Sequence, residues 1–225
     1  MTHLRYLNTT CAVCGESCRF TIPEAAGSVG PRDLDTRPAE PLRSTIYAWV
    51  KRCPSCGYCA PDPGKAPKGA ADVVKLPRYR WQLDSRKFPK IANTFLCWSV
   101  IQEDLAVPAQ AAWGSLHAAW ICDDEGEDVP ARICRKRAAD LLRRAWEQGE
   151  RLSPLAGTDE ALLADLLRRA GRLREARGVV AETLEQNPQP IITDIMRLQA
   201  RLIAGSDRGP HTVAEARRFR QPALL

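Results

Sequence analysis

The spacing of apolar residues changes along the chain, and the change falls near residue 88. Before this point, apolar and polar residues alternate in two short stretches, 18–22 and 44–52. Alternation with a period of two predicts β-strands, because successive side chains of a strand point to opposite faces. The apolar positions of the two stretches are Cys18, Phe20, Ile22, Ile46, Ala48 and Val50. The front of the chain is therefore expected to be a small β unit.

After residue 88 the apolar residues recur at helical spacing, most clearly over residues 157–188. Thr158 is placed to cap a first helix, and acidic residues follow it where the helix dipole favours negative charge. Gly171 predicts a break, and Asn187-Pro188 predicts the end of a second helix. The apolar residues expected on the inner faces are Leu162, Leu163, Leu166, Leu167, Ala170, Leu173, Ala176, Val180 and Leu184.

This helical hairpin has the length of one tetratricopeptide repeat (TPR), about 34 residues. A second helical pair is expected over 111–146, a leading helix over 90–105, another helix over 191–204 and a short one over Val213–Phe219. A single repeat cannot bury its apolar face alone, so the hairpins are expected to stack. A helical bundle without a repeat is the alternative.

Two Cys-x-x-Cys-Gly motifs, CAVCG at 11–15 and CPSCG at 53–57, carry the strongest chemical signal. Two residues between the cysteines let a tight turn direct both sulfurs at one ion, and two such turns supply the four ligands of a closed zinc site. The glycine that follows permits a positive φ, so the turn can close with backbone N–H groups directed at sulfur. We expect one structural zinc ion, held by Cys11, Cys14, Cys53 and Cys56.

Other uses of these thiols also fit the spacing. An iron–sulfur cluster takes four thiolates, and a rubredoxin-like iron site uses similar paired motifs. A redox pair of the thioredoxin type would need a βαβ context, which the sequence does not indicate. Cys18 and Cys59 follow the two motifs closely, so either could replace a ligand. A buried apolar role is nevertheless expected for these two and for the remaining cysteines, Cys97, Cys122 and Cys134.

Composition adds a cellular context. The chain has 225 residues and an odd number of cysteines, nine. Its N-terminus lacks the apolar segment of a secretory signal, so a cytoplasmic location with reduced thiols is expected. No apolar run approaches the ~18 residues that a membrane-spanning helix needs, and no membrane association is expected.

The net charge of +6 is a reason to consider nucleic-acid binding, and the positive charge is concentrated in one segment. Residues 75–90 carry six basic groups against one acidic group, with Tyr79 and Trp81 between them. The segment is expected to be a solvated basic linker. The alternative is a nucleic-acid-binding surface, formed together with the cysteine-rich front, on which the two aromatic rings stack against bases.

No familiar catalytic motif occurs in the sequence: it has no nucleophile elbow, phosphate loop or HExxH. Asp33 and Asp35 could be paired carboxylates, but hydrogen bonding within their proline-rich loop is the expected role. His117 lies beside Trp113 and Trp120 on an expected helix and is interpreted as a core or surface residue. Four cysteine ligands would leave no open position on the metal. A non-enzymatic role is therefore favoured, although enzymatic activity stays an open question.

The order of these motifs resembles a bacterial family known only as a domain of unknown function, the domain of unknown function 2225 type. The resemblance implies a cytosolic zinc ribbon joined to TPR-like helices, and it implies no activity. The additional Cys18 and Cys59 and the arginine-rich, irregular repeats depart from the family pattern. The residues that carry the resemblance are Cys11–Gly15, Arg32–Asp35, Tyr47–Val50 and Cys53–Tyr58, followed by the helices from about residue 88.

Together these observations predict an α+β chain: a small β zinc ribbon at the N-terminus followed by an all-α, TPR-like array of helical hairpins. Residues 1–65 are expected to form the ribbon domain, 66–87 a basic linker and 88–225 the helical domain. The predicted function is a zinc-binding, non-enzymatic module whose helical array binds a protein or peptide. Arginines around one helical turn are expected to favour an acidic partner: Arg168, Arg169, Arg172, Arg174 and Arg177.

Overall fold

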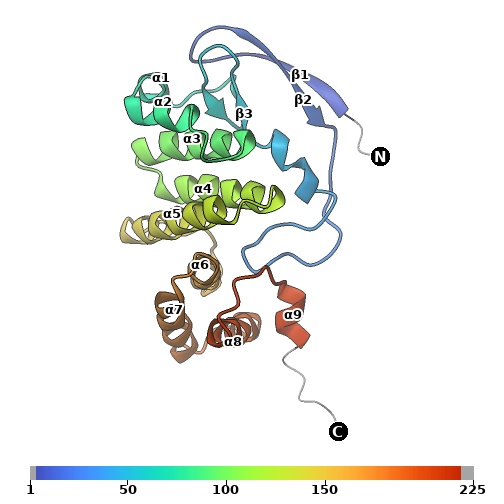
Figure 1. Ribbon diagram of the computed structural model, residues 1–225, viewed down its shortest axis with the longest axis vertical. Helices are drawn as coiled ribbons and strands as arrows, with labels where there is room; N and C mark the ends of the chain where they lie inside the picture. The colour runs from blue at the N-terminus through green and yellow to red at the C-terminus, as the bar shows by residue number, and fades with distance from the viewer. Residues whose placement is uncertain (1–3, 219–225) are drawn as a thin grey trace.

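The computed structural model describes residues 4–218 of the chain. Figure 1 shows a β-hairpin at one end of the molecule and helices stacked along its long axis. The fold is α+β, as the sequence predicts, and one continuous cluster of buried apolar side chains runs from Cys11 to Ala216. The elements are β1 (Leu4–Thr10), β2 (Ser17–Pro23), the 3-10 helix η1 (Arg43–Ala48), β3 (Lys51–Arg52), β4 (Cys59–Ala60), α1 (Ala70–Val73), α2 (Pro77–Leu83), α3 (Lys90–Asp104), α4 (Pro108–Asp124), α5 (Asp128–Glu147), α6 (Thr158–Arg169), α7 (Leu173–Glu185), α8 (Pro190–Ala204) and α9 (Val213–Arg218).

The first hairpin pairs β1 with β2 in antiparallel register, so that Thr10 lies opposite Ser17 at its closed end. The prediction of a strand over 18–22 is confirmed, and Cys18 is buried while Phe20 is partly buried. β1 was not expected, because most of its side chains are exposed and leave no alternating apolar face in the sequence. The turn of this hairpin carries the first cysteine motif.

The prediction of a strand over 44–52 is wrong for most of that stretch. Residues Arg43–Ala48 form η1, and only Lys51–Arg52 are extended, as β3 paired with β4. Thr45 explains the local preference: its hydroxyl donates to the carbonyl of Leu42 at 2.7 Å and accepts from the indole N–H of Trp49 at 2.9 Å. Side-chain bonds of this kind to nearby backbone compete with strand pairing. The alternation marked which residues are buried, but not the backbone conformation.

The segment expected to be a basic linker, residues 66–87, contains α1 and α2 and packs against the second cysteine motif. Tyr79 is fully buried, and its hydroxyl donates to the carbonyl of Gly57 at 2.8 Å and accepts from the N–H of Cys59 at 3.2 Å. Pro77 begins α2, where its missing N–H costs nothing. Trp81 remains 76% exposed. The aromatic residues of this segment therefore have opposite environments.

Helices α3, α4 and α5 form the middle of the stack, and the predictions for 90–105 and 111–146 are confirmed as helices. α4 is buried along most of its length, because α3 and α5 pack against it on either side. Gly114 permits the close approach of α3: a Cβ at this position would lie 3.1 Å from the carbonyl oxygen of Phe95. Gly126 has a φ of +72° in the turn from α4 to α5.

Helices α6 and α7 confirm the hairpin predicted over 157–188, and Gly171 adopts a φ of +84° in the turn between them. The expected capping role of Thr158 is wrong, since its buried hydroxyl has no hydrogen-bond partner in the described part of the chain. Asp159 in the first turn instead fixes the preceding loop, because its carboxylate accepts the N–H groups of Leu152 and Ser153 at 2.8 and 3.0 Å. The helix predicted over 191–204 corresponds to α8. α9 ends at Arg218, and Phe219 lies outside the described residues.

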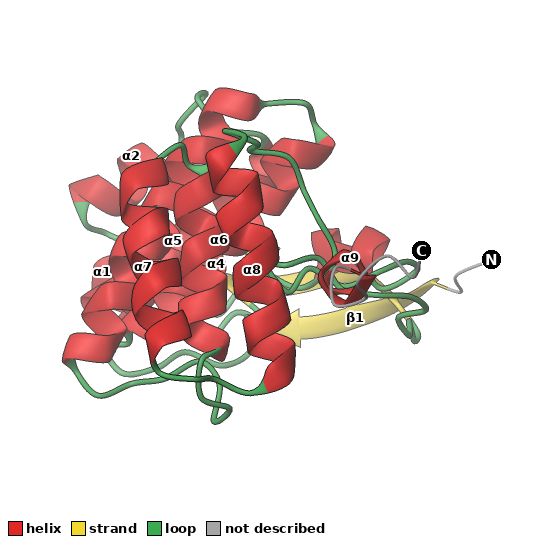
Figure 2. Cartoon of the chain, turned by 90° about the horizontal axis from the view of Figure 1, so that it is seen from below, coloured by secondary structure: helices red, strands yellow, loops and turns green. Residues whose placement is uncertain are grey.

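The loop between β2 and η1 runs alongside the helical stack and reaches the C-terminal segment (Figure 1). Leu34 donates its N–H to the carbonyl of His211 at 2.8 Å, and Val213 donates to the carbonyl of Arg32 at 2.9 Å. Figure 2 shows the helices as one body with the first hairpin extending from its side. In residues 4–218, none of the helices combines the length and apolar character needed to cross a membrane.

Candidate metal centre

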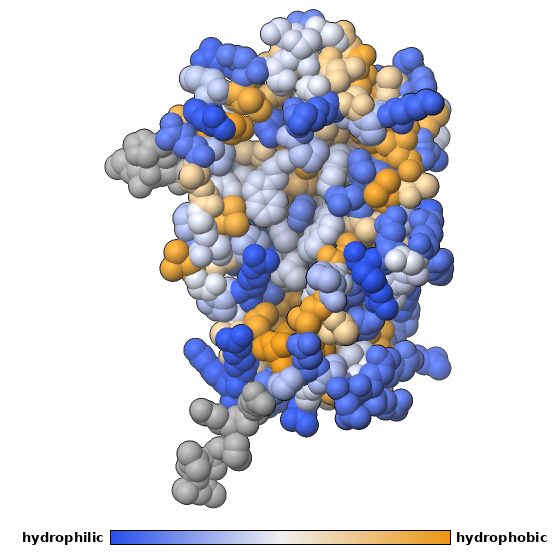
Figure 3. All heavy atoms as spheres, turned by 180° about the vertical axis from the view of Figure 1, so that it is seen from behind, coloured by the Kyte–Doolittle hydropathy of each residue, from blue (hydrophilic) through white to orange (hydrophobic). Residues whose placement is uncertain are grey.

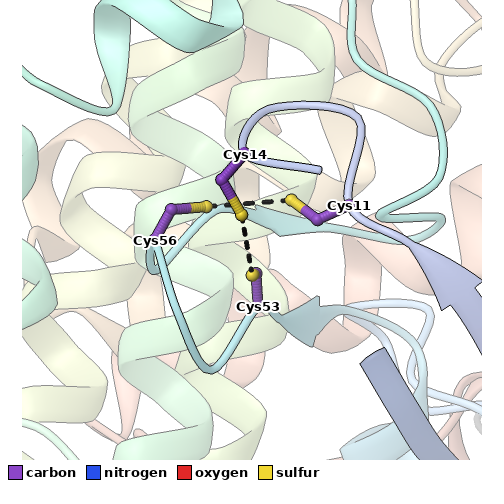
Figure 4. Close-up of side chains that lie close together, drawn as sticks. All are labelled: Cys11, Cys14, Cys53 and Cys56. Atoms are coloured by element: carbon purple, nitrogen blue, oxygen red, sulfur yellow. Dashed lines mark hydrogen bonds between the residues drawn. The ribbon is translucent and has the colours of Figure 1, made fainter. Parts of the chain in front are cut away.

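Both cysteine motifs form the turns of β-hairpins, and the turns face each other (Figure 4). The sulfur of Cys11 lies 3.7 Å from that of Cys56, and the sulfur of Cys14 lies 3.7 Å from that of Cys53. All four sulfurs lie within 4.8 Å of one another. The structure therefore brings together the four cysteines that the sequence predicts as ligands.

The two turns have the same backbone hydrogen bonds. In the first, the N–H of Gly15 donates to the carbonyl of Cys11 at 2.8 Å, and in the second the N–H of Gly57 donates to the carbonyl of Cys53 at 3.0 Å. The N–H of each first cysteine closes its turn by donating to the carbonyl five residues later, at 2.8 Å in both cases. Gly15 and Gly57 have φ angles of +77° and +79°. The expectation that glycine supplies a positive φ here is confirmed in both motifs.

Backbone N–H groups also point at the sulfurs. Burial alone would raise the pKa of the Cys53 thiol, but the N–H groups of Cys56 and Ser55 donate to its sulfur, and the pKa falls to about 6. Burial raises the pKa of the Cys11 thiol, although the N–H groups of Cys14 and Val13 act in the opposite direction. The thiolate is the form that binds a metal, so these donors favour the ligating state of the cluster.

The sulfur spacing fits one tetrahedral ion. Four sulfurs held ~2.3 Å from a central metal at tetrahedral angles lie about 3.8 Å from one another. The measured separations of 3.7 Å come close to that value. A disulfide would need a sulfur separation of ~2.05 Å, and all nine cysteines are free thiols. The group can bind a metal ion as a closed set of four sulfur ligands.

Cys18 and Cys59 lie outside this set. The sulfur of Cys18 is 3.8 Å from that of Cys53, on the buried face of β2. Burial raises the pKa of the Cys18 thiol to about 11, which disfavours the thiolate. The sulfur of Cys59 is not one of the four grouped sulfurs and donates to the carbonyl of Gly57 at 3.3 Å. Both are buried, as the sequence predicts, and so are Cys97, Cys122 and Cys134.

A second polar cluster forms where the front loop meets the helices. Asp35 accepts the backbone N–H of Arg37 at 3.3 Å, which is the loop bonding expected from the sequence. Its carboxylate also accepts from the indole of Trp120 at 2.9 Å and from the guanidinium of Arg169 at 2.8 Å. Arg135 lies 3.6 Å from the same oxygen. The acidic loop residue is therefore an anchor between distant elements.

The part played by Arg135 was not predicted, although the sequence carries a signal for it. Arg135 lies at helical spacing between Ala131 and Ala138, on the buried stripe of α5, and it is itself buried. A basic residue in an apolar stripe indicates a buried ion pair, because an unpaired buried charge is strongly unfavourable. The partner of Arg135 is Asp123. Burial alone would raise the pKa of the Asp123 carboxyl, but the guanidinium groups of Arg135 and Arg169 hold this pKa below its usual value.

The arginines expected to attract an acidic partner divide into three groups by burial and pairing. Arg168 and Arg169 are buried and paired with Asp165 and Asp35, so little of either side chain is exposed on the helical surface. Arg172 is bound by Glu175 and also pairs with Asp140. The exposed members of the group are Arg174 and Arg177.

His117 packs in an aromatic group rather than in a catalytic arrangement. The centres of its ring and that of Trp120 are 4.7 Å apart, and the rings of Trp49 and Phe95 meet it edge-on at 5.2 and 5.5 Å. Burial lowers the pKa of His117 to about 3. The interpretation of His117 as a packed residue agrees with these contacts.

Comparison with known proteins returned no match: no protein-family model, no curated protein sequence and no solved structure is similar to this chain.

Proposed function

We propose that this chain is a zinc-binding, non-enzymatic module that binds a protein or peptide partner. The observation that carries the proposal is the closed group of four cysteine sulfurs, with spacings of 3.7 Å between the facing pairs. Structural zinc takes four protein ligands in this arrangement, whereas a catalytic zinc keeps one position for water or substrate. The ion would join two short hairpins that have little core of their own.

Zinc is preferred to iron because a closed set of four thiolates on two short turns is the usual structural zinc site. Metal analysis of the purified protein tests this choice directly. We expect one zinc per chain in protein that was purified without added metal. One iron per chain would instead indicate a rubredoxin-like iron site. Folded protein without bound metal would overturn the proposal that the four cysteines bind a metal ion.

The partner surface is assigned to the helical array. Helices α4 and α5, and then α6 and α7, follow one another as antiparallel hairpins, which supports a TPR-like arrangement and the likeness to the uncharacterised bacterial family. Figure 3 shows that hydrophobic surface on one face is divided into patches bordered by hydrophilic side chains. Such a surface favours a partner recognised largely by charge. Arg174 and Arg177 on α7 are exposed and would favour an acidic segment.

Affinity capture with matched variants tests this part. The chain would be compared with the double variant Arg174→Glu/Arg177→Glu and with the control Lys68→Glu/Lys87→Glu, which makes the same charge change at other exposed positions. A partner retained by the control and lost with the α7 variant is the expected result. Equal retention by all three proteins would remove α7 from the interface.

Nucleic-acid binding through the cysteine-rich front and residues 75–90 is the second candidate, supported by the exposure of Trp81. Its support is smaller than the sequence suggests, because Tyr79 is buried and cannot stack on a base. Arg80 donates to the carbonyl of Cys56 at 2.9 Å, and Arg78 pairs with Asp104. Binding to a single-stranded oligonucleotide should weaken steeply as salt is raised and should fall in Trp81→Ala. No binding at low salt would eliminate this candidate.

A further inference from the structure

A cavity with a volume of about 630 Å³ lies where the front loop meets α5, the end of α6 and the segment that follows α8. Four aspartates and six arginines contribute to its lining. Counting these side chains gives a net charge of 6 − 4 = +2, and the buried carboxylate of Asp35 beneath them reduces this to +1. The six arginines are Arg37, Arg43, Arg132, Arg135, Arg169 and Arg208.

Four of these arginines already have an acidic partner. Arg43 pairs with Asp33, Arg37 with Asp124, Arg135 with Asp123 and Arg169 with both Asp35 and Asp123. Arg37, Arg135 and Arg169 are each more than nine-tenths buried, with exposed fractions of 4%, 2% and 7%. The floor of the cavity is therefore made of rigid, oriented guanidinium groups. This rigidity lowers the cost of ordering them around a ligand.

These paired arginines nevertheless keep unused donors. The Nε atoms of Arg37, Arg43, Arg135 and Arg169 are buried and have no hydrogen-bond partner among residues 4–218. A buried N–H without an acceptor costs free energy, and nearly all such groups in folded proteins are satisfied. Four unsatisfied Nε donors on residues that line one cavity show that the surrounding carboxylates do not match all the N–H groups of these arginines.

The rim adds two further cations. Arg132 on α5 and Arg208 after α8 are exposed, and neither makes an ion pair with any residue between 4 and 218. Arg208 is placed over the turn at Gly171, where a Cβ would lie 3.4 Å from its Cζ atom. Two guanidinium groups without an ion pair thus join four paired arginines in the lining of one cavity.

We propose that this cavity binds an oxyanion group, a phosphate or a carboxylate, with Arg132 and Arg208 closing over it. Guanidinium groups recognise both kinds of oxyanion through paired N–H donors. Asp33, Asp123 and Asp124 are each paired with an arginine, and the fourth carboxylate of the lining, Asp128, is exposed on α5. The site is separate from the cysteine cluster, and it does not depend on the metal or on the partner surface of α7.

Calorimetric titration of the full chain tests the proposal with two probes, inorganic phosphate and a tetraglutamate peptide, at about 0.15 M chloride, where long-range charge effects are screened. The variant is Arg132→Ala/Arg208→Ala, since both side chains are exposed and their removal should not disturb folding. The matched control is Lys68→Ala/Arg197→Ala, which removes the same charge from exposed positions that belong neither to the cavity nor to the α7 surface.

The expected result is saturable binding of one or both probes by the native chain and the control, weakened about tenfold or more in the rim variant, because charge-assisted hydrogen bonds are lost. Tighter binding of phosphate would assign a phosphate group, and tighter binding of the peptide would assign carboxylates. Absence of binding to both probes would overturn the proposal. So would an equal loss in the control variant, because that result would mean non-specific attraction to positive charge.

Discussion

The indole N–H of Trp120 donates to the carboxylate of Asp35 at 2.9 Å, although 85 residues separate the two in sequence. The same carboxylate oxygen accepts a hydrogen bond from Arg169 at 2.8 Å. The front loop, α4 and α6 are therefore held at one point inside the protein. Because the Asp35 side chain is fully buried, the strength of this junction depends on keeping its charge paired.

Replacing Asp35 with alanine should lower the free energy of unfolding by about 3–5 kcal/mol, because Arg169 and Arg135 would lose a buried counter-charge. Urea denaturation followed by tryptophan fluorescence measures the change. The control is Asp72→Ala, which removes an exposed pair with Lys75 at 3.7 Å. Its expected cost is ~0–1 kcal/mol. Similar small costs for the two variants would show that the junction contributes little.

The two knuckle glycines provide a matched comparison. Both have a positive φ, but a Cβ at Gly57 would lie 2.5 Å from the Cδ2 atom of buried Leu83. At Gly15, no atom of the residues that the structure describes would lie within 4 Å of a Cβ. Gly15→Ala should cost ~1–2 kcal/mol from backbone strain alone. Gly57→Ala should cost about 1–3 kcal/mol more, because Leu83 must move in a packed core. Thermal and urea unfolding of the metal-bound proteins would measure both, and equal costs would contradict the packing argument.

Removing one ligand should abolish metal binding, while removing the neighbouring fifth cysteine should not. Cys14→Ser changes an exposed member of the cluster and should reduce the bound metal from one per chain to near zero. Cys18→Ala changes a buried thiol whose sulfur lies 3.8 Å from that of Cys53, and it should keep the metal. Elemental analysis gives the ratio for both variants. Metal loss in Cys18→Ala with full retention in Cys14→Ser would exchange their roles.

Stability should also fall in mild acid because of His117. Its pKa is lowered to about 3 by burial, whereas an unfolded chain binds a proton there near pH ~6.5. Between these values the unfolded state holds the additional proton, so the free energy of unfolding decreases by up to ~1.4 kcal/mol per pH unit as the pH falls. Above the unfolded value this effect is absent.

The variant His117→Phe should keep the aromatic packing and lose this contribution to the pH dependence. Urea unfolding at about pH 7 and about pH 5 compares the variant with the native chain across the window in which only the unfolded histidine is protonated. Nuclear magnetic resonance titration of the imidazole gives an independent measurement. An imidazole that titrates near its ordinary value in the folded protein would contradict the prediction.

Local patterns predicted most of the helices and the ligand group. The apolar stripe of Leu162, Leu163 and Leu166 predicted a helix, and these residues are buried in α6. The repeated Cys-x-x-Cys-Gly motif predicted both turns, because the tight geometry needs only a few consecutive residues. The pattern at Ile46, Ala48 and Val50 predicted their burial correctly and their conformation wrongly. Three alternating positions cannot separate a strand from a tight helix that is enclosed on several sides.

By itself, the sequence determined the features that depend on neighbouring residues. These are the positions of most helices, the glycines with positive φ and the two cysteine motifs. Only the tertiary structure decided how the two cysteine motifs face each other. It also decided that Arg168 and Arg169 are buried while Arg174 is exposed, and that Tyr79 bonds to the second cysteine motif. The physical reason is that an arginine or a tyrosine has the same local preferences on either face of a helix. Its role depends on the charges and donors that distant segments bring beside it, as Asp35 and Arg169 do across 134 residues.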